Sequence, residues 1–145
     1  MKDKTRMMLV IGSGLFALAL VYVFQRANYG LLLFEGLGTP PNENWIFVIN
    51  KSLRLVANDL ICFFMIFSIF KEKNYRQVAV VVFMIELLVI LPIYLLLKLN
   101  LEGTSEISSP MLSFIHRLIV NPTLMIFTGM ALAYQKFIFP TLRKS

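Results

Sequence analysis

The stretch Gln77–Leu97, QVAVVVFMIELLVILPIYLLL, decides the fold class of this chain. It is almost entirely apolar over about 20 residues, which is the length that an α-helix needs to cross the hydrocarbon core of a bilayer. In lipid, every backbone N–H and C=O must be hydrogen-bonded within the segment, and a helix satisfies this requirement by itself. We therefore predict that this stretch is a transmembrane helix.

Three further segments have the same apolar character: Met7–Gln25, Leu55–Phe70 and Leu118–Tyr134. The last of them becomes longer if it begins at Met111. Of the 145 residues, 58% are hydrophobic and only 15% are charged, and a soluble domain of this size cannot bury so much apolar side chain. We predict an all-α fold, an integral membrane four-helix bundle that forms a single domain over residues 1–145.

Lysine and arginine predict how this bundle lies in the membrane, because cytoplasmic loops carry an excess of both. Nine of the 14 basic residues lie at one end of the four segments: Lys2, Lys4, Arg6, Lys71, Lys73, Arg76, Lys136, Arg143 and Lys144. The other five lie in or beside the longer loops 26–54 and 98–115: Arg26, Lys51, Arg54, Lys98 and Arg117. Both termini are therefore expected in the cytoplasm, with the two longer loops on the outer side.

The same charge distribution argues against a nucleic-acid partner. The net charge is +6, but the basic residues flank apolar runs, as orientation signals do in membrane proteins. A single cysteine excludes an internal disulfide. The sequence contains no Gly-rich phosphate loop and no His/Cys metal spacing, so we predict neither a cofactor nor a metal site.

Two local features of the first third have alternative explanations. The segment Met7–Gln25 has the basic start of a signal peptide, but its apolar stretch exceeds the about 7–15 residues of a signal h-region, so we expect an uncleaved span. In the loop that follows, Leu31–Phe34 and Trp45 suit a segment that lies at the membrane interface. A packed hydrophobic loop explains the same residues equally well.

Polar side chains within the spans mark candidate sites, because they are costly in lipid. Arg54, Asn58 and Cys62 recur every four residues and share one helical face, and Glu86 lies near the middle of its span as an intramembrane acid. If both termini are cytoplasmic, the polar residues at the outer ends of two spans lie at the same depth in the membrane. We predict that they form a polar outer-layer cluster: Arg54, Asn58, Asp59, His116, Arg117 and Asn121.

Three explanations of this cluster stay open. It is structural if Asp59 neutralises Arg54 or Arg117 and the asparagines bridge helices. It is a binding site if the polar layer receives a partner protein. It is catalytic if Cys62 acts as a nucleophile with His116 and Arg54. Because Cys62 lies about 12 Å along the helix from Arg54, too deep for easy access of water, we assign no catalytic residue.

Small residues predict where helices approach one another closely. Ser13 with Ala17, and Gly129 with Ala133, are small-xxx-small pairs of the kind that allow close packing in lipid. They indicate contacts between spans, with a partner, or within a homo-oligomer.

Motifs in the last two thirds of the chain resemble those of the small membrane proteins associated with exosortase F in Bacteroidota. The matching motifs follow one another in the family's order over roughly Leu53–Met130. They are LRLVANDLICFFMIFSIF, a short basic turn, LLVILPIY and FIHRLIVNPTLM. In the first third, YGLLLFEGLG departs from the family's FYDP-like stretch. The matching positions are Arg54, Asn58, Pro92, Tyr94, His116, Arg117, Asn121 and Pro122.

The resemblance implies a companion of an exosortase, a membrane transpeptidase that processes C-terminal sorting signals of exported proteins. Exosortase catalysis is not implied for this chain, because Arg54 precedes Cys62 in one helix, whereas the family's enzymes carry the cysteine first and in a separate segment. We therefore expect a non-enzymatic accessory subunit of the bacterial inner membrane that docks with an exosortase-type enzyme through the outer polar layer. The alternatives are an unusual thiol enzyme using Cys62, and a small proton-coupled transporter using Glu86.

Overall fold

The computed structural model describes residues 2–105 and 109–138, and within these ranges the chain forms helices and no strand. The helices follow one another along the chain as α1 (Lys2–Phe24), α2 (Tyr29–Leu37), α3 (Glu43–Ile69), α4 (Lys73–Ile85), η1 (Glu86–Ile90), α5 (Leu91–Leu101), α6 (Pro110–Val120), α7 (Thr123–Ala133) and η2 (Tyr134–Ile138). The prediction of an all-α chain is confirmed.

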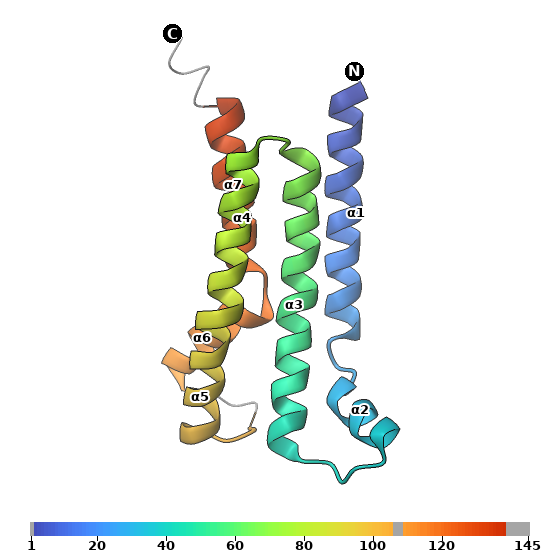
Figure 1. The fold of residues 1–145 in the computed structure, drawn as a ribbon, viewed down its shortest axis with the longest axis vertical. Helices are drawn as coiled ribbons and strands as arrows, with labels where there is room; N and C mark the ends of the chain where they lie inside the picture. The colour runs from blue at the N-terminus through green and yellow to red at the C-terminus, as the bar shows by residue number, and fades with distance from the viewer. Residues whose placement is uncertain (1, 106–108, 139–145) are drawn as a thin grey trace.

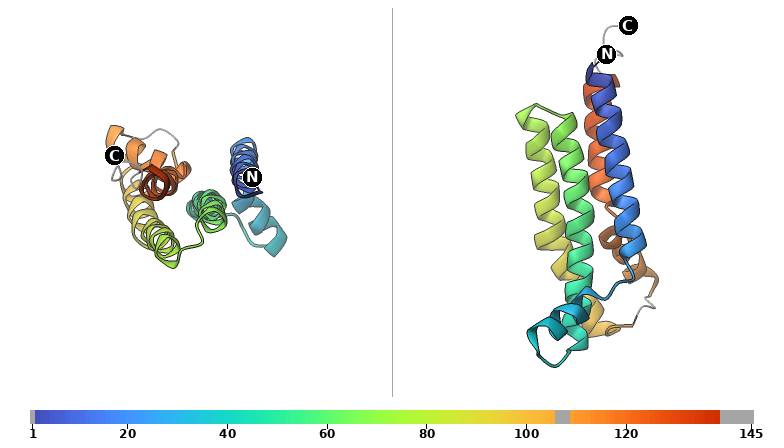
Figure 2. Two further views of the ribbon diagram at one scale, coloured as in Figure 1. Left: turned by 90° about the horizontal axis from the view of Figure 1, so that it is seen from above. Right: turned by 90° about the vertical axis from the view of Figure 1, so that its right-hand side faces the viewer.

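Four helical rods run roughly side by side (Figures 1 and 2): α1, α3, the continuous α4–η1–α5, and α7 with η2. The start of α1, the α3–α4 turn and η2 lie at one end, which we call the termini end. The turn after α1, helix α2 and the start of α3 lie at the opposite end, the loop end. Helix α3 packs against α1, α4 and α7 and is therefore central to the arrangement.

Three helices are long and apolar enough to cross a membrane: Lys4–Phe24, Glu43–Ile69 and Lys73–Leu101. The fourth predicted span is a pair of shorter helices, Pro110–Ile119 and Thr123–Phe137, which are bent by 60°. The chain thus has three candidate spans, or four if the bent pair counts as one. A multi-pass membrane protein is consistent with this finding, whereas the four-helix bundle and the cytoplasmic placement of both termini stay predictions.

Pro122 explains the bend between α6 and α7. A residue that precedes proline is pushed out of the helical region, and Asn121 accordingly has φ −112° and ψ 140°. Proline also lacks the N–H that would continue the hydrogen-bond ladder of α6. Helix α7 begins directly afterwards, at Thr123.

A wider turn interrupts the third rod where Pro92 follows. Over Glu86–Ile90 the hydrogen bonds follow the π pattern, and the N–H of Leu91 donates to the carbonyl of Glu86. In a regular α-helix the ring of Pro92 would clash with the preceding turn, and Pro92 cannot donate to it. A π segment at this point keeps the rod continuous.

The α3–α4 turn at the termini end is held by Arg76. Its Nε donates to the carbonyl of Phe70 over 2.9 Å, and a terminal guanidinium nitrogen donates to the carbonyl of Phe67 over 3.1 Å. These carbonyls end α3 and have no partner inside the helix. Close by, Lys136 of η2 forms an ion pair with Glu72 over 2.9 Å. The end of α3 is therefore tied to α4, and the turn is tied to η2.

Helix α2 is fixed to α3 by two asparagines. The side-chain oxygen of Asn28 accepts from the N–H of Leu31 over 3.2 Å and from the amide of Asn50 over 2.9 Å. The oxygen of Asn50 in turn accepts from the N–H of Gly30 over 2.8 Å. At this crossing a Cβ on Gly30 would lie only 2.8 Å from the Cα of Ile46. Glycine is thus required here by the close approach of two helices.

Gly30→Ala should therefore weaken the docking of α2, because the new methyl group meets the backbone of α3 rather than a flexible side chain. We expect a loss of about 1–3 kcal/mol, as for other overpacked contacts, read as a lower Tm of the purified protein in detergent. Gly36→Ala is the matched control, because a Cβ there meets nothing within 4 Å. Equal Tm values for the two variants would contradict the close contact.

Candidate functional site

Arg54 lies at the centre of the polar residues that the sequence singled out. Its side chain is half-buried on α3, and its guanidinium donates a hydrogen bond to the side-chain oxygen of Gln25, just beyond the end of α1. Three neighbouring hollows of the molecule are each lined in part by Arg54. Arg54 therefore connects these three hollows.

The first hollow is a polar cavity of about 710 Å³ at the loop end, which we call the loop-end cavity. It lies between the turn after α1, the first half of α3, and α5 with α6. Four of its lining residues are basic: Arg26, Lys51, Arg54 and Lys98. His116, Tyr94 and Asn50 add polar groups, and none of the described lining residues is acidic. The described lining of the cavity is therefore rich in basic and other polar side chains.

Two contacts build the wall of this cavity on the side of α5 and α6. The hydroxyl of Tyr94, which is fully buried, lies 2.6 Å from Nδ1 of His116, and the two rings are 5.7 Å apart. One turn further along α5, Lys98 is only 1% exposed and forms an ion pair with Glu102 over 2.6 Å. A buried lysine needs such a partner.

Glu102 also connects α5 to α6. Its second carboxylate oxygen accepts from the N–H of Ser109 over 2.7 Å, and Ser109 is the residue before α6. The hydrogen bonds from Lys98 and Ser109 lower the pKa of the Glu102 carboxyl to about 2. Glu102 thus holds the connection between the two helices that carry Tyr94 and His116.

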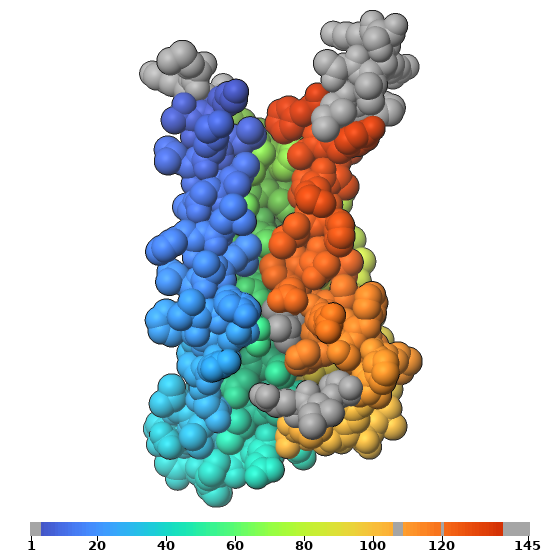
Figure 3. Space-filling model, turned by 180° about the vertical axis from the view of Figure 1, so that it is seen from behind, coloured from blue at the N-terminus to red at the C-terminus, as the bar shows by residue number. Residues whose placement is uncertain are grey.

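The second hollow runs between α1 and α7, with α3 as its floor, and we call it the α1–α7 groove. Figure 3 shows it from behind, with α1 in blue, α7 in orange to red, and α3 in green between them. Its part nearer the loop end, about 250 Å³, is lined in part by Arg54, Asn58 and Asn121. A second part, about 350 Å³, shares Leu18 and Ile126 with the first and is almost entirely apolar.

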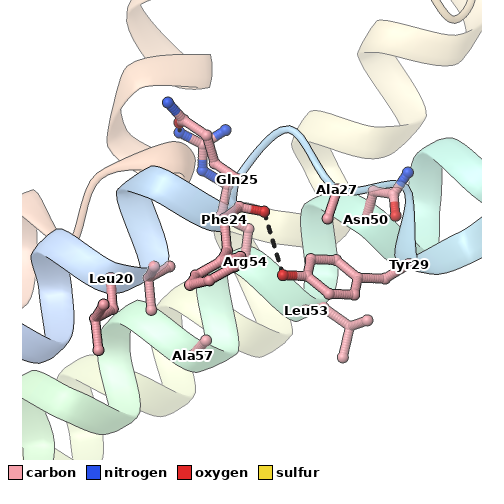
Figure 4. A pocket seen from close by; sticks show the side chains of 10 residues that line it. Leu20, Phe24, Gln25, Ala27, Tyr29, Asn50, Leu53, Arg54 and Ala57 are labelled. Carbon is pink, nitrogen blue, oxygen red and sulfur yellow. Dashed lines mark hydrogen bonds between the residues drawn. The ribbon is translucent and has the colours of Figure 1, made fainter.

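The third hollow is an apolar groove of about 420 Å³ on another face of α1 and α3, which we call the α1–α3 groove. Figure 4 shows Leu20 and Ala57 toward one end of it and Asn50 and Tyr29 toward the other. The hydroxyl of Tyr29 donates to the carbonyl of Phe24 over 3.2 Å. The groove shares four residues with the loop-end cavity: Gln25, Ala27, Asn50 and Arg54.

Asp59 and Glu86 meet inside the protein. Each is only 2% exposed, and their side chains interact with each other. One oxygen of each carboxyl, Asp59 Oδ2 and Glu86 Oε2, has no hydrogen-bond partner among the described residues. The intramembrane acid Glu86 thus has Asp59 as its partner.

The six residues of the predicted outer-layer cluster are divided among different surroundings. Arg54 and His116 line the loop-end cavity, whereas Asn58 and Asn121 line the α1–α7 groove. Asp59 is buried against Glu86, and Arg117 is exposed on α6. The structure therefore brings Arg54 together with three of the five other residues, in two separate hollows.

Cys62 lies apart from the polar residues in an apolar cluster. It is buried with Ile66, Phe70 and Met125, and it lines the apolar part of the α1–α7 groove. His116 lines the loop-end cavity, and Arg54 lines that cavity and the polar part of the groove, whereas Cys62 lines the apolar part. Among the described residues, no group of three His, Cys, Asp or Glu side chains could hold a metal ion.

Comparisons with protein families, curated proteins and solved structures found no match. Functional inference therefore depends on the geometry and chemistry of the hollows themselves.

Sequence reasoning misses four contributors to the loop-end cavity. It interprets Arg26, Lys51 and Lys98 only as orientation charges, and Gln25 only as the end of a span. A signal for Lys98 was present, because Tyr94, Lys98 and Glu102 follow one another at intervals of four and share a helical face. No comparable pattern indicated Gln25, whose role follows from the turn after α1.

The Asp59–Glu86 contact predicts different outcomes for two substitutions. Glu86→Gln should lower stability by less than about 1 kcal/mol, because the amide can still donate to Asp59. Glu86→Ala leaves Asp59 buried without its partner and should cost about 2–3 kcal/mol or more. Unfolding of both variants in mixed micelles measures the difference, and equal losses would argue against a direct contact between Asp59 and Glu86.

The contribution of Glu102 should depend on pH. The pKa of its carboxyl falls from an ordinary 4.5 to about 2 in the folded chain, so the stabilisation is complete above about pH 4.5. It is lost as the pH falls toward 2. The Tm difference between the natural chain and Glu102→Gln should therefore shrink between about pH 5 and about pH 3. Glu35→Gln, which removes an exposed carboxyl on α2, is the control and should show no such trend.

Proposed function

We propose that this chain is a non-enzymatic accessory subunit that binds a membrane protein by receiving one of its transmembrane helices in the α1–α7 groove. The observation that carries the proposal is the composition of this groove. One part is almost entirely apolar, and the part nearer the loop end presents Arg54, Asn58 and Asn121. Such a surface matches a helix that is apolar along most of its length and polar near one end.

The apolar part of the groove suits close helix packing. Gly129 of α7 faces Ile66 of α3, and a Cβ at Gly129 would lie 3.7 Å from that side chain. Small residues at such positions let a neighbouring helix approach closely, and dispersion between packed side chains then favours association in lipid. The pair Gly129 and Ala133 predicted from the sequence lines this part of the groove.

The polar part of the groove sets the orientation of the partner helix and makes its binding specific. Asn58 is buried and Asn121 is exposed, and both line the groove near the level of Arg54. Hydrogen bonds between helices in membranes contribute about 1 kcal/mol each. A partner helix that places a polar residue at this level is favoured over one that is wholly apolar, because the exposed side chain of Asn121 can hydrogen-bond to it.

The resemblance to the companions of exosortase F makes an exosortase-type transpeptidase the partner that we propose. The motif positions Arg54, Asn58, Asn121 and Pro122 all line the polar part of the groove. The burial of Cys62 in an apolar cluster supports an accessory role in preference to a thiol enzyme. A buried cysteine in such surroundings behaves as a small apolar residue.

Co-purification tests the proposal. The chain, extracted from its native membrane in a mild detergent, should retain an exosortase-type protein in near-equal amount, identified by mass spectrometry. Gly129→Leu fills the groove and should reduce the retained partner about tenfold, a loss near 1.4 kcal/mol. Asn58→Ala and Asn121→Ala should each reduce it less.

Gly12→Leu is the matched control, because it makes the same change at an exposed position of α1 where a Cβ meets nothing within 4 Å. It should leave the partner bound. The Tm of each variant shows that the chain itself stays folded. A folded Gly129→Leu variant that keeps its partner would overturn the groove as the docking site, and a natural chain that purifies alone would overturn the accessory role.

A further inference from the structure

We propose that helix α2 and Trp45 form a lipid-binding surface in the headgroup interface of the leaflet at the loop end. The exposed apolar side chains of α2 would contact acyl chains just below the headgroups, and the indole of Trp45 would lie among the headgroups. This interfacial surface consists of Tyr29, Leu32, Leu33, Leu37 and Trp45. None of these residues lines the α1–α7 groove, so the proposal is independent of the partner helix.

The face of α2 that points away from α3 is apolar. Gly30 is buried and Leu31 and Phe34 are half-buried, so these residues form the side that packs on α3. At 3.6 residues per turn, the exposed residues of the helix fall within an arc of about 140° on the other side. They are Tyr29, Leu32, Leu33 and Leu37, of which Leu32 and Leu37 are more than 60% exposed. A helix that faces water normally carries polar residues on its outer face, which α2 does not.

The end of α1 places the start of α2 at the boundary of the hydrocarbon core. The candidate span Lys4–Phe24 covers 21 residues, which is about 31 Å at 1.5 Å per residue. The hydrocarbon core of a bilayer is about 30 Å thick, so Phe24 lies at its boundary. The hydroxyl of Tyr29 donates to the carbonyl of Phe24 over 3.2 Å. Helix α2 therefore begins at the level where the core meets the headgroups.

Helix α3 gives the same level independently. Helix α2 crosses it where Gly30 approaches Ile46 and donates its N–H to the side chain of Asn50 over 2.8 Å. From the end of α3 at Ile69, the distance along the axis is about 29 Å to Asn50 and about 35 Å to Ile46. Trp45, next to Ile46, is 60% exposed. Tryptophan is enriched at the headgroup level of membrane proteins, which is where this position falls.

Continuity with α1 favours lipid over a second protein as the neighbour of this surface. Val23 and Phe24 at the end of α1 are more than half exposed, and α2 follows them closely along the chain (Figures 1 and 2). None of the hollows described above is lined by Leu32, Leu33 or Leu37. A face without a hollow offers no shape for a partner's side chains, whereas fluid acyl chains need none. Interfacial helices bury such faces about 5–10 Å into the boundary of headgroups and chains.

The fluorescence of Trp45 tests the proposal in the natural, full-length chain, because Trp45 is the only tryptophan of the sequence. The purified chain is reconstituted into phosphatidylcholine vesicles whose acyl chains carry bromine, a contact quencher. The emission should shift to shorter wavelength than that of N-acetyltryptophanamide in water. It should lose most of its intensity with bromine near the headgroup end of the chains, and less with bromine near their methyl ends.

Two results would overturn the proposal. Long-wavelength emission that aqueous iodide quenches and brominated lipid does not would place Trp45 in water. Short-wavelength emission that neither quencher reduces would show that protein, such as a second copy of this chain, covers the surface.

A second pair of probes places α2 itself. In a Trp45→Phe background, Leu33→Trp should be quenched by shallow bromine as Trp45 is. Thr39→Trp is the matched control, because Thr39 is exposed on the connection between α2 and α3, which extends farther from the termini end than α2 does (Figure 1). It should be quenched less by bromine and more by iodide. Equal iodide quenching of the two folded variants, with folding established by Tm, would contradict the placement of α2 in the interface.

Discussion

A helix in lipid gains little from covering its apolar side chains with another helix, because lipid tails are equally apolar. The arrangement of this chain depends on that constraint. Its helices are joined by specific polar contacts: Arg76 on the last carbonyls of α3, Asn50 with Asn28 at the start of α2, and Glu102 between Lys98 and Ser109. Near the middle of the spans, Asp59 and Glu86 join α3 to the rod that contains α4.

The same constraint explains what the amino-acid sequence can predict. Apolar runs give the helical class and three of the long segments, because hydropathy indicates which segments can enter lipid. They do not give helix ends. Helix α3 begins at Glu43 rather than near Leu55, since polar residues such as Asn50 and Lys51 continue the helix beyond the hydrocarbon core. The bend at Pro122 follows from local chemistry, but its angle of 60° depends on packing.

Which polar side chains pair with each other was harder to predict from the sequence than how deep each lies along its helix. Counting residues along a helix places Arg54, Asn58 and Asp59 within about two turns of one another, but the rotation of each helix decides which side chain faces which hollow. Adjacent residues lie about 100° apart around the axis, so Asn58 faces the α1–α7 groove while Asp59 faces Glu86. Arg54 is long enough to reach three hollows at once. Changes at Arg54 alone would therefore mix several effects.

The bent pair of helices has a consequence for the surrounding bilayer. The straight part, Thr123–Phe137, covers about 22 Å at 1.5 Å per residue, which is less than the about 30 Å of a typical hydrocarbon core. Helix α6 turns away at 60°, so the about 15 Å of Pro110–Ile119 adds about half of its length along the axis of α7. The two helices together then reach about 30 Å. The bent pair therefore matches a typical bilayer only through the tilted helix α6, and a sharper bend at Pro122 would make the chain thinner on the side of α7 and compress the lipids beside it.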